Sequence, residues 1–324
     1  MIILGIECTA HTFGVGIVKD GKVVSNEKSL FTTEKGGMIP AKVADYHVEK
    51  FPEVLRKAVM DSKIKLKDVD YIAYSQSPGI GHSLRVGAIV ARTMSLQLNK
   101  PLIGVNHCIA HLEIGRALSS FKDPLLLYAS GANTQLIGFE AGRYRIFGET
   151  LDIGIGNFLD SLARTLGIGF PGGPKIEELA KKGGYKELPY VVKGMDVVLG
   201  GILTYCKEMN KKGVSKEDIC FSVQETVFAM LTEVTERALA HTGKNELVVG
   251  GGVGCNKRLQ EMLKKMCLER GVKFYSPENE FLVDNAAMIA LTGYYMKDSF
   301  NEDYEKNGRI NPYLRTDEVE IRYR

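Results

Sequence analysis

The chain has 324 residues, of which 44% are hydrophobic, so it can bury a sizeable core and form two domains. Its 42 basic and 39 acidic residues nearly cancel, which excludes a strongly basic nucleic-acid-binding protein and leaves only a local patch for such a contact. The six cysteines form no Cys-x-x-Cys pair, and the apolar stretch Met1–Ile6 is too short for a signal peptide or membrane span. We therefore expect a reduced, cytoplasmic protein without membrane contact.

The first expected unit is a strand, a polar loop and a hairpin over residues 2–27, with a turn at Asp20-Gly21. Its loop carries Glu7 and His11. Apolar periodicity then predicts a helix over 40–62, and further patterns predict a strand at 71–74, a helix over 83–98 and a strand at 102–105.

Two histidines follow the strand at 102–105. His107 and His111 lie four residues apart, on one face of a helix that begins near Asn106, and this spacing can place two imidazoles on one divalent ion. A metalloprotease is disfavoured because Cys108 stands where the general-base glutamate would follow the first histidine. The alternative is two histidines that pack or cap at a helix start.

The stretch Leu126–Gln135 is a buried strand that runs into a loop of small residues, Ser130 to Thr134, whose backbone donors could bind an anion. A hairpin over 135–148 follows. This unit repeats residues 2–27 at an offset of about 121, and the strand and glycine loop at 71–79 recur at 247–254. The second pair of repeats is separated by a larger offset than the first pair, so the second half must contain extra residues. We expect this insertion between about 170 and 220.

A duplication of this kind predicts an α/β fold with two lobes facing each other across a cleft. We expect residues 1–120 to form the first lobe and residues 121–324 the second, with the C-terminal segment able to pack back on the first. In this arrangement the helix after the strand at 273–275 is the counterpart of the His107 helix. It brings Asp284 opposite His107 and His111, with Tyr128 in the same cleft, and this mixed nitrogen and oxygen set suits iron or zinc.

A nucleotide site is expected in the second lobe. The loop Gly250–Gly254 joins a strand to a helix that starts near Asn256, so its backbone could lie close to a purine or a ribose. Asp160 is expected on the helix after the second hairpin, and Glu177 is expected to begin the next helix; both could accept hydrogen bonds from ribose hydroxyls. Each carboxylate could equally be a helix cap or a surface charge.

Seven segments together resemble one known family: Gly5–Thr12, Val105–Glu113, Tyr128–Gln135, Gly148–Asn157, Phe170–Pro174, Val192–Asp196 and Arg315–Glu320. They are similar to the universal tRNA threonylcarbamoyltransferases, specifically the catalytic subunit of the archaeal and eukaryotic KEOPS complex. The resemblance covers nearly the whole chain. It implies the duplicated actin-like or sugar-kinase-like fold, which agrees with the repeat.

The resemblance also implies a reaction, in which a threonylcarbamoyl group moves from threonylcarbamoyl-AMP to the exocyclic amine of the adenosine 3′ of the anticodon, and AMP leaves. The cofactor would be one divalent metal ion, iron in the first place and zinc as the alternative. By residue match the metal ligands would be His107, His111, Tyr128 and Asp284. The residues contacting the adenylate would be Tyr128, Ala129, Ser130, Gly131, Ala132, Asp160, Gly173, Glu177 and Asn256.

The implied partners are tRNA and three KEOPS subunits: a RIO-like kinase or ATPase, a tRNA-binding subunit and a dimerising subunit. We expect one of them to dock on the helices at 40–55 and 83–98. Basic residues available to tRNA are scattered, at Lys35, Arg85, Arg92, Lys181, Lys182 and Lys193. We therefore predict that the chain alone transfers poorly.

The chain departs from the family pattern at Ala132, Gly200, Lys257 and Ala286. If Ala132 needs a positive φ, its Cβ costs about 1 kcal/mol. No catalytic residue is assigned. His11 and Glu7 are the candidates for a proton acceptor, and the alternative for each is a structural residue or one that contacts a metal ligand from behind. The alternative functions are a non-catalytic nucleotide-binding scaffold and a sugar or acetate kinase, although no sugar-side aspartate base is identified.

Overall fold

The computed structural model describes residues 1–33, 38–299 and 307–324. Within these ranges the strands form two five-stranded sheets and a two-stranded ribbon, β9 (Val192–Lys193) with β10 (Asp196–Val197). The first sheet contains β1 (Ile2–Glu7), β2 (Thr12–Lys19), β3 (Lys22–Leu30), β4 (Tyr71–Ser77) and β5 (Leu102–Asn106). The second contains β6 (Leu125–Ala129), β7 (Thr134–Glu140), β8 (Arg143–Glu149), β11 (Glu246–Gly250) and β12 (Lys273–Tyr275).

The two sheets share one topology. Their strand orders are β3-β2-β1-β4-β5 and β8-β7-β6-β11-β12, so each is an antiparallel meander extended by two parallel strands. Equivalent hairpins turn at Asp20-Gly21 and Ala141-Gly142, and all four residues have positive φ, between 50° and 80°. This geometry matches a two-residue turn to the strand twist. The predicted duplication and both predicted hairpins are confirmed.

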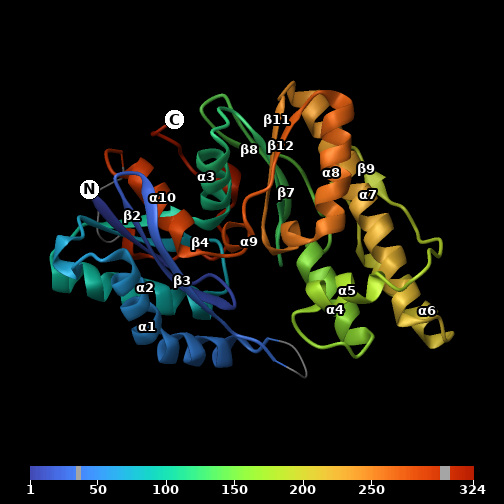
Figure 1. Ribbon diagram of the computed structural model, residues 1–324, viewed down its shortest axis with the longest axis horizontal. Helices are drawn as coiled ribbons and strands as arrows, with labels where there is room; N and C mark the ends of the chain where they lie inside the picture. The colour runs from blue at the N-terminus through green and yellow to red at the C-terminus, as the bar shows by residue number, and fades with distance from the viewer. Residues whose placement is uncertain (34–37, 300–306) are drawn as a thin grey trace.

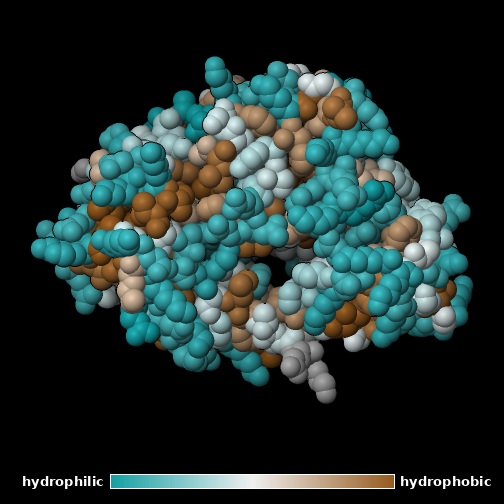
Figure 2. Space-filling model, in the orientation of Figure 1, coloured by the Kyte–Doolittle hydropathy of each residue, from teal (hydrophilic) through white to brown (hydrophobic). Residues whose placement is uncertain are grey.

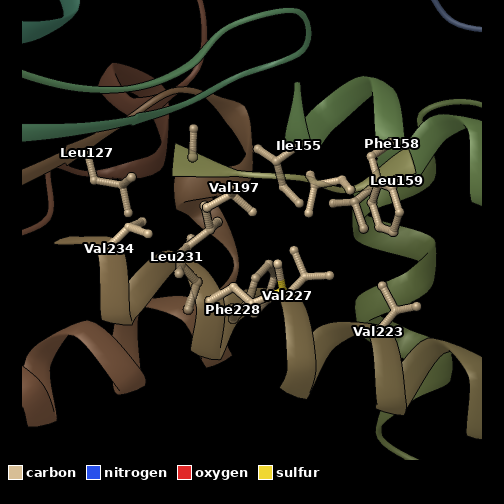
Figure 3. Close-up of a cluster of buried hydrophobic side chains, with 14 of the residues drawn as sticks. Leu127, Ile155, Phe158, Leu159, Val197, Val223, Val227, Phe228, Leu231 and Val234 are labelled. Atoms are coloured by element: carbon tan, nitrogen blue, oxygen red, sulfur yellow. The ribbon is translucent and has the colours of Figure 1, made fainter. Parts of the chain in front are cut away.

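Helices cover both faces of each sheet (Figure 1). In the first half they are α1 (Pro40–Ser62), α2 (Gly81–Leu98) and α3 (His107–Ser119). The second half contains α4 (Ile155–Thr165), α5 (Gly172–Ala180), α6 (Gly200–Lys211), α7 (Lys216–Thr242), α8 (Lys257–Arg270), α9 (Asn279–Leu282) and α10 (Ala286–Met296). Figure 3 shows Leu127 of β6 beside Leu231 and Val234 of α7 in the core of the second half. Burying each such side chain contributes about 1.5–3 kcal/mol, and this packing anchors α7 on the sheet.

Two helices pack on the sheet of the other half. α3 follows β5, yet Ile109 and Leu112 belong to the cluster that contains Leu126 and Val248 of the second sheet. α10 follows β12 and α9, yet it packs on β1 and β2 of the first sheet. α10 is buried from Ala286 through Gly293, because its sequence is apolar on every side. This exchange brings the N-terminal ends of α3 and α10 together between the sheets.

Two glycines let α10 approach the first sheet. A Cβ on Gly16 would lie 2.4 Å from the backbone nitrogen of Ala287, and one on Gly5 would lie 2.5 Å from that of Ala290. Real Cβ atoms do not come this close to backbone, so both positions require glycine. The position of the segment just before α10 therefore depends on β1 and β2.

Some local expectations change. The short helix α9 stands between β12 and α10, so Asp284 lies in a connection and Asn285 caps α10. Glu177 lies within α5 and does not begin it. Between β8 and β11 the second half contains α4, α5, the β9–β10 ribbon, α6 and α7. The lobe limits at residue 120 and the insertion bounds at about 170 and 220 remain predictions.

Lys35 lies outside the described residues. No helix in the described part of the chain is both long and apolar enough to cross a membrane.

Candidate functional site

A cavity of about 460 Å³ opens between the two halves, and Figure 2 shows the hollow near the centre of this face. Both sheets contribute their strand-end loops to its walls, as expected for two lobes of equivalent topology. The predicted site residues that line it are His11, His107, Tyr128, Ser130, Gly131, Ala132, Asp160 and Asp284. Those that do not line it are Glu7, His111, Ala129, Gly173, Glu177 and Asn256.

His107, His111 and Asp284 form one group of side chains at this cavity. Their potential ligand atoms lie within 4.8 Å of one another, and Nε2 of each histidine is 3.4 Å from Oδ1 of Asp284. The start of α3 fixes the histidines, because Oδ1 of Asn106 accepts from the N–H groups of Cys108 and Ile109 at 3.0 and 3.1 Å. The helix spacing predicted for the two histidines is confirmed.

Glu7 supports this group from behind. It is fully buried, and its Oε2 accepts from Nδ1 of His107 at 3.0 Å. Its Oε1 accepts from the N–H and the hydroxyl of Thr9. The contact holds a proton on Nδ1 of His107, so Nε2, on the side of Asp284, is the ring nitrogen that a metal ion could bind in place of a proton. This position agrees with the alternative that the sequence left for Glu7, a structural residue behind the expected metal ligands.

The pKa values of the three side chains in this group are shifted from their usual values. Burial works to lower the pKa of His107, but the carboxylates of Glu7 and Asp284 outweigh it and raise that pKa well above its usual value. Burial works to raise the pKa of Asp284, but His107 and His111 hold it well below its usual range. Burial lowers the pKa of His111. Neither ring nitrogen of His111 has a hydrogen-bond partner among the described residues, so either nitrogen could serve as a metal ligand.

Tyr128 lies beside the two histidines. Its ring centroid is 5.0 Å from that of His111 and 6.4 Å from that of His107. The residue is buried at the end of β6, and burial raises the pKa of its hydroxyl well above its usual value. The phenol is therefore neutral, and its place agrees with the expected fourth ligand.

The loop after β6 packs on the start of α4. The carbonyls of Ser130 and Gly131 accept from the N–H groups of Gly156 and Asn157 at 3.0 and 2.9 Å. A Cβ on Gly156 would lie 2.6 Å from Cα of Gly131, so the close approach requires glycine.

The N–H groups of Gly131 and Ala132 make no hydrogen bond within the described chain, and both residues line the cavity. Ala132 has no positive φ, so the backbone cost considered for this departure does not arise.

The residues expected around the nucleotide have internal partners. Oδ1 of Asp160 accepts from Gly172 N–H at 2.7 Å, so Asp160 is a cap that also lines the cavity. Burial raises the pKa of Asp160, although the Gly172 N–H and the nearby His11 both work to lower it. Glu177 accepts from Lys257 N–H at 2.9 Å, and Asn256 caps α8 through the N–H groups of Arg258 and Leu259.

Several lining residues were not singled out in the sequence: Thr9, Asn157, Phe170 and Pro312. Thr9, Asn157 and Phe170 lie in segments that carried the family resemblance, which was the available signal. Pro312 comes from the C-terminal segment, which reaches the cavity because Gly79 N–H donates to its carbonyl at 3.2 Å. Only tertiary structure places it there.

Comparison with known proteins gives two kinds of likeness. The model of the tRNA N6-adenosine threonylcarbamoyltransferase family matches residues 21–291. A tRNA N6-adenosine threonylcarbamoyltransferase of Thermococcus sibiricus is 53% identical over 324 residues, 99% of each chain. A probable bifunctional tRNA threonylcarbamoyladenosine biosynthesis protein of Methanocaldococcus jannaschii is 50% identical, and the match covers all of this chain but 60% of that protein.

Solved structures agree in fold. HypF in its phosphate- and nucleotide-bound form has a TM-score of 0.62 at 14% identity, over 92% of this chain and 56% of that one. Component A of (R)-2-hydroxyglutaryl-CoA dehydratase from Acidaminococcus fermentans has a TM-score of 0.58 at 16% identity, over 92% and 100%. These likenesses confirm the duplicated, actin-like α/β fold. The family match and the close relatives confirm the resemblance read from the sequence: the chain belongs to the tRNA N6-adenosine threonylcarbamoyltransferase family.

Proposed function

We propose that this chain transfers a threonylcarbamoyl group from threonylcarbamoyl-AMP to the exocyclic amine of the adenosine 3′ of the anticodon, in tRNAs that read codons beginning with A. The observation that carries the proposal is that one cavity is lined both by His107 and Asp284, which form a group with His111, and by Gly131 and Ala132 with their free N–H groups. Family membership favours this transfer over the kinase alternative.

The donor's anionic phosphate and carbamoyl oxygen fit this cavity. Attack of the amine on the carbamoyl carbon places negative charge on oxygen, and the Gly131 and Ala132 N–H groups are free to meet it. Tyr128, Ser130 and Asp160 line the same cavity, whereas Ala129, Gly173, Glu177 and Asn256 are not among its lining residues. AMP is a good leaving group, so no nucleophilic triad is needed.

We propose one divalent metal ion in the site, iron in the first place and zinc as the alternative. Two imidazoles and one carboxylate within 4.8 Å fit both ions, and a set of two histidines and one carboxylate with open positions is typical of iron. The unpartnered ring of His111 supports the fit. Tyr128 would complete the set. When bound, the ion supplies positive charge to the phosphate or the carbamoyl oxygen.

The partner subunits proposed are those of KEOPS: a RIO-like kinase or ATPase, a tRNA-binding subunit and a dimerising subunit, in the cytoplasm. The bifunctional relatives are longer than this chain, which agrees with a second enzyme acting alongside it. A docking surface for one subunit is proposed on α1 and α2. Large apolar side chains are exposed there, at Val48, Met60, Ile89 and Leu96, between 60% and 70% each.

The proposal is tested by incubating the chain with tRNA and pre-made threonylcarbamoyl-AMP, with and without the partner subunits, and measuring modified adenosine after nuclease digestion. We expect full transfer with the subunits and little without them. A complete mixture that binds the donor but forms no product would favour the scaffold alternative. Full turnover by the chain alone would contradict the need for partners.

A further inference from the structure

We propose that His11 is the general base of the transfer, taking the proton of the attacking adenosine amine; this rests on the proposed function. The sequence left Glu7 and His11 as candidates, and the structure separates them. Both oxygens of Glu7 are engaged, by Thr9 and by His107, and the side chain is fully buried away from the cavity. His11 lines the cavity and is half-buried.

The backbone that carries His11 is held on every side. The carbonyl of Ala10 accepts from Nε2 of His47 and from the hydroxyl of Ser83, both at 2.9 Å. The His11 carbonyl accepts from Phe31 N–H at 2.9 Å. His47 is itself buried, and this contact fixes its Nε2 as the protonated nitrogen. Three separate segments therefore fix the backbone that carries His11, as catalysis by a positioned base requires.

The imidazole of His11 is available to substrate. Its ring meets the edge of Phe170, with centroids 5.8 Å apart, so Phe170 sets the ring orientation without using a ring nitrogen. No described residue forms a hydrogen bond with its nitrogens. His11 comes from the first half of the chain, and the anion-binding loop comes from the second. A carbamoyl group at Gly131 and Ala132 would thus share the cavity with His11.

The step balances as follows. The amine nitrogen forms a bond to the carbamoyl carbon, and the bond from that carbon to the phosphate oxygen of AMP breaks, with its electron pair leaving on AMP. The proton lost by the amine moves to a ring nitrogen of His11 and then to water. The lone pair of this amine is delocalised into the purine, so removing its proton during attack has a large effect, of about 100-fold or more.

The test uses the protein together with its partner subunits, tRNA and threonylcarbamoyl-AMP, and compares wild type with His11→Ala and His11→Gln. The control is His241→Ala, an exposed histidine on α7 far along the chain from the site, which should keep the wild-type rate. We expect His11→Ala to lose about 100-fold in transfer rate while its affinity for AMP, measured by calorimetry, stays unchanged. Added imidazole should restore the rate in His11→Ala.

The pH profile gives an independent reading. The dependence of the transfer rate on pH should differ between the wild type and His11→Gln, because the variant lacks the ring that accepts the proton. The other titratable groups around the loop are Glu7, His47, Asp160, His107 and Asp284, and all are unchanged in that variant.

Wild-type rate in either His11 variant would overturn the assignment and leave the proposed function standing. A loss that imidazole does not restore and that comes with lost AMP affinity would show a structural role and also overturn it. An inactive wild type would overturn both the proposed function and the role of His11.

Discussion

Glu7 and His107 form a buried hydrogen bond in which the carboxylate accepts from Nδ1 at 3.0 Å. The bond joins the end of β1 to the start of α3, so it sets both the protonation and the direction of the ring. A carboxylate behind a metal-binding histidine raises its basicity and fixes its orientation. The relationship makes Glu7 a positioning residue for the proposed metal site.

Glu7→Gln should therefore weaken metal binding about 10- to 100-fold without unfolding the chain, because the amide keeps the shape but loses the charge. The measurement is a competition titration of the metal-free protein with zinc and a chromophoric chelator. Glu140→Gln is the control, since Glu140 is exposed at the turn after β7. Equal affinity in wild type and Glu7→Gln would contradict the role.

Gly16→Ala should destabilise the protein by about 1–3 kcal/mol or more, because the new Cβ would meet the backbone of Ala287 at 2.4 Å. Gly201→Ala is the matched control: it lies at the start of α6 with no atom within 4 Å of the added Cβ and should be neutral or slightly stabilising. Urea unfolding of both variants measures the difference. A Gly16→Ala variant as stable as the control would mean that α10 does not approach β2 this closely.

The local parts of this site were predictable. His107 and His111 share a helix face at fixed spacing, and the repeat of strand, loop and hairpin identified the loop at Ser130 and the counterpart position of Asp284. A place behind the metal ligands was one alternative for Glu7, but its hydrogen bond to His107 and the path of Pro312 were not predictable, because both depend on contacts between distant segments. The strain considered for Ala132 is absent because the loop keeps negative φ there.

Asp152 carries a testable pH dependence. Its oxygens accept from the N–H groups of Leu199 and Gly200 at 3.0 and 2.6 Å, at the start of α6. Burial works to raise its pKa, but these backbone donors outweigh it and lower the pKa below the usual value. An acid whose pKa is lower in the folded state stabilises the protein above its unfolded pKa, near 3.9, and loses that contribution as the pH falls through the folded value.

Asp152→Asn should thus be less stable than wild type by about 0.3–1 kcal/mol at pH 7, because the amide keeps an acceptor oxygen but loses the negative charge at the helix start. The gap should shrink as the pH falls below about 4. Thermal unfolding from pH 3 to pH 7 measures it. A gap that stays constant over this range would show that the charge of Asp152 does not act at the helix start.

Asp160 lines the cavity, and only one of its oxygens accepts from Gly172 N–H. Glu177 does not line the cavity and already accepts from Lys257 N–H. The second oxygen of Asp160 is therefore a better candidate than Glu177 for binding a ribose hydroxyl. AMP should bind more tightly than its deoxyribose analogue by about 1–3 kcal/mol, and Asp160→Asn should reduce this preference more than Glu177→Gln does. Calorimetry with both ligands measures it. Equal affinities of the wild type for AMP and the analogue would remove both residues from the ribose role.

The most direct measurement is an anomalous-diffraction scan across the iron and zinc absorption edges, on crystals of the wild type and of a variant carrying His107→Ala and His111→Ala. We predict one strong peak in the wild type, bounded by His107, His111 and Asp284, and none at that place in the variant. A wild-type crystal from active protein with no peak there, or with the same peak in both proteins, would contradict the proposed site.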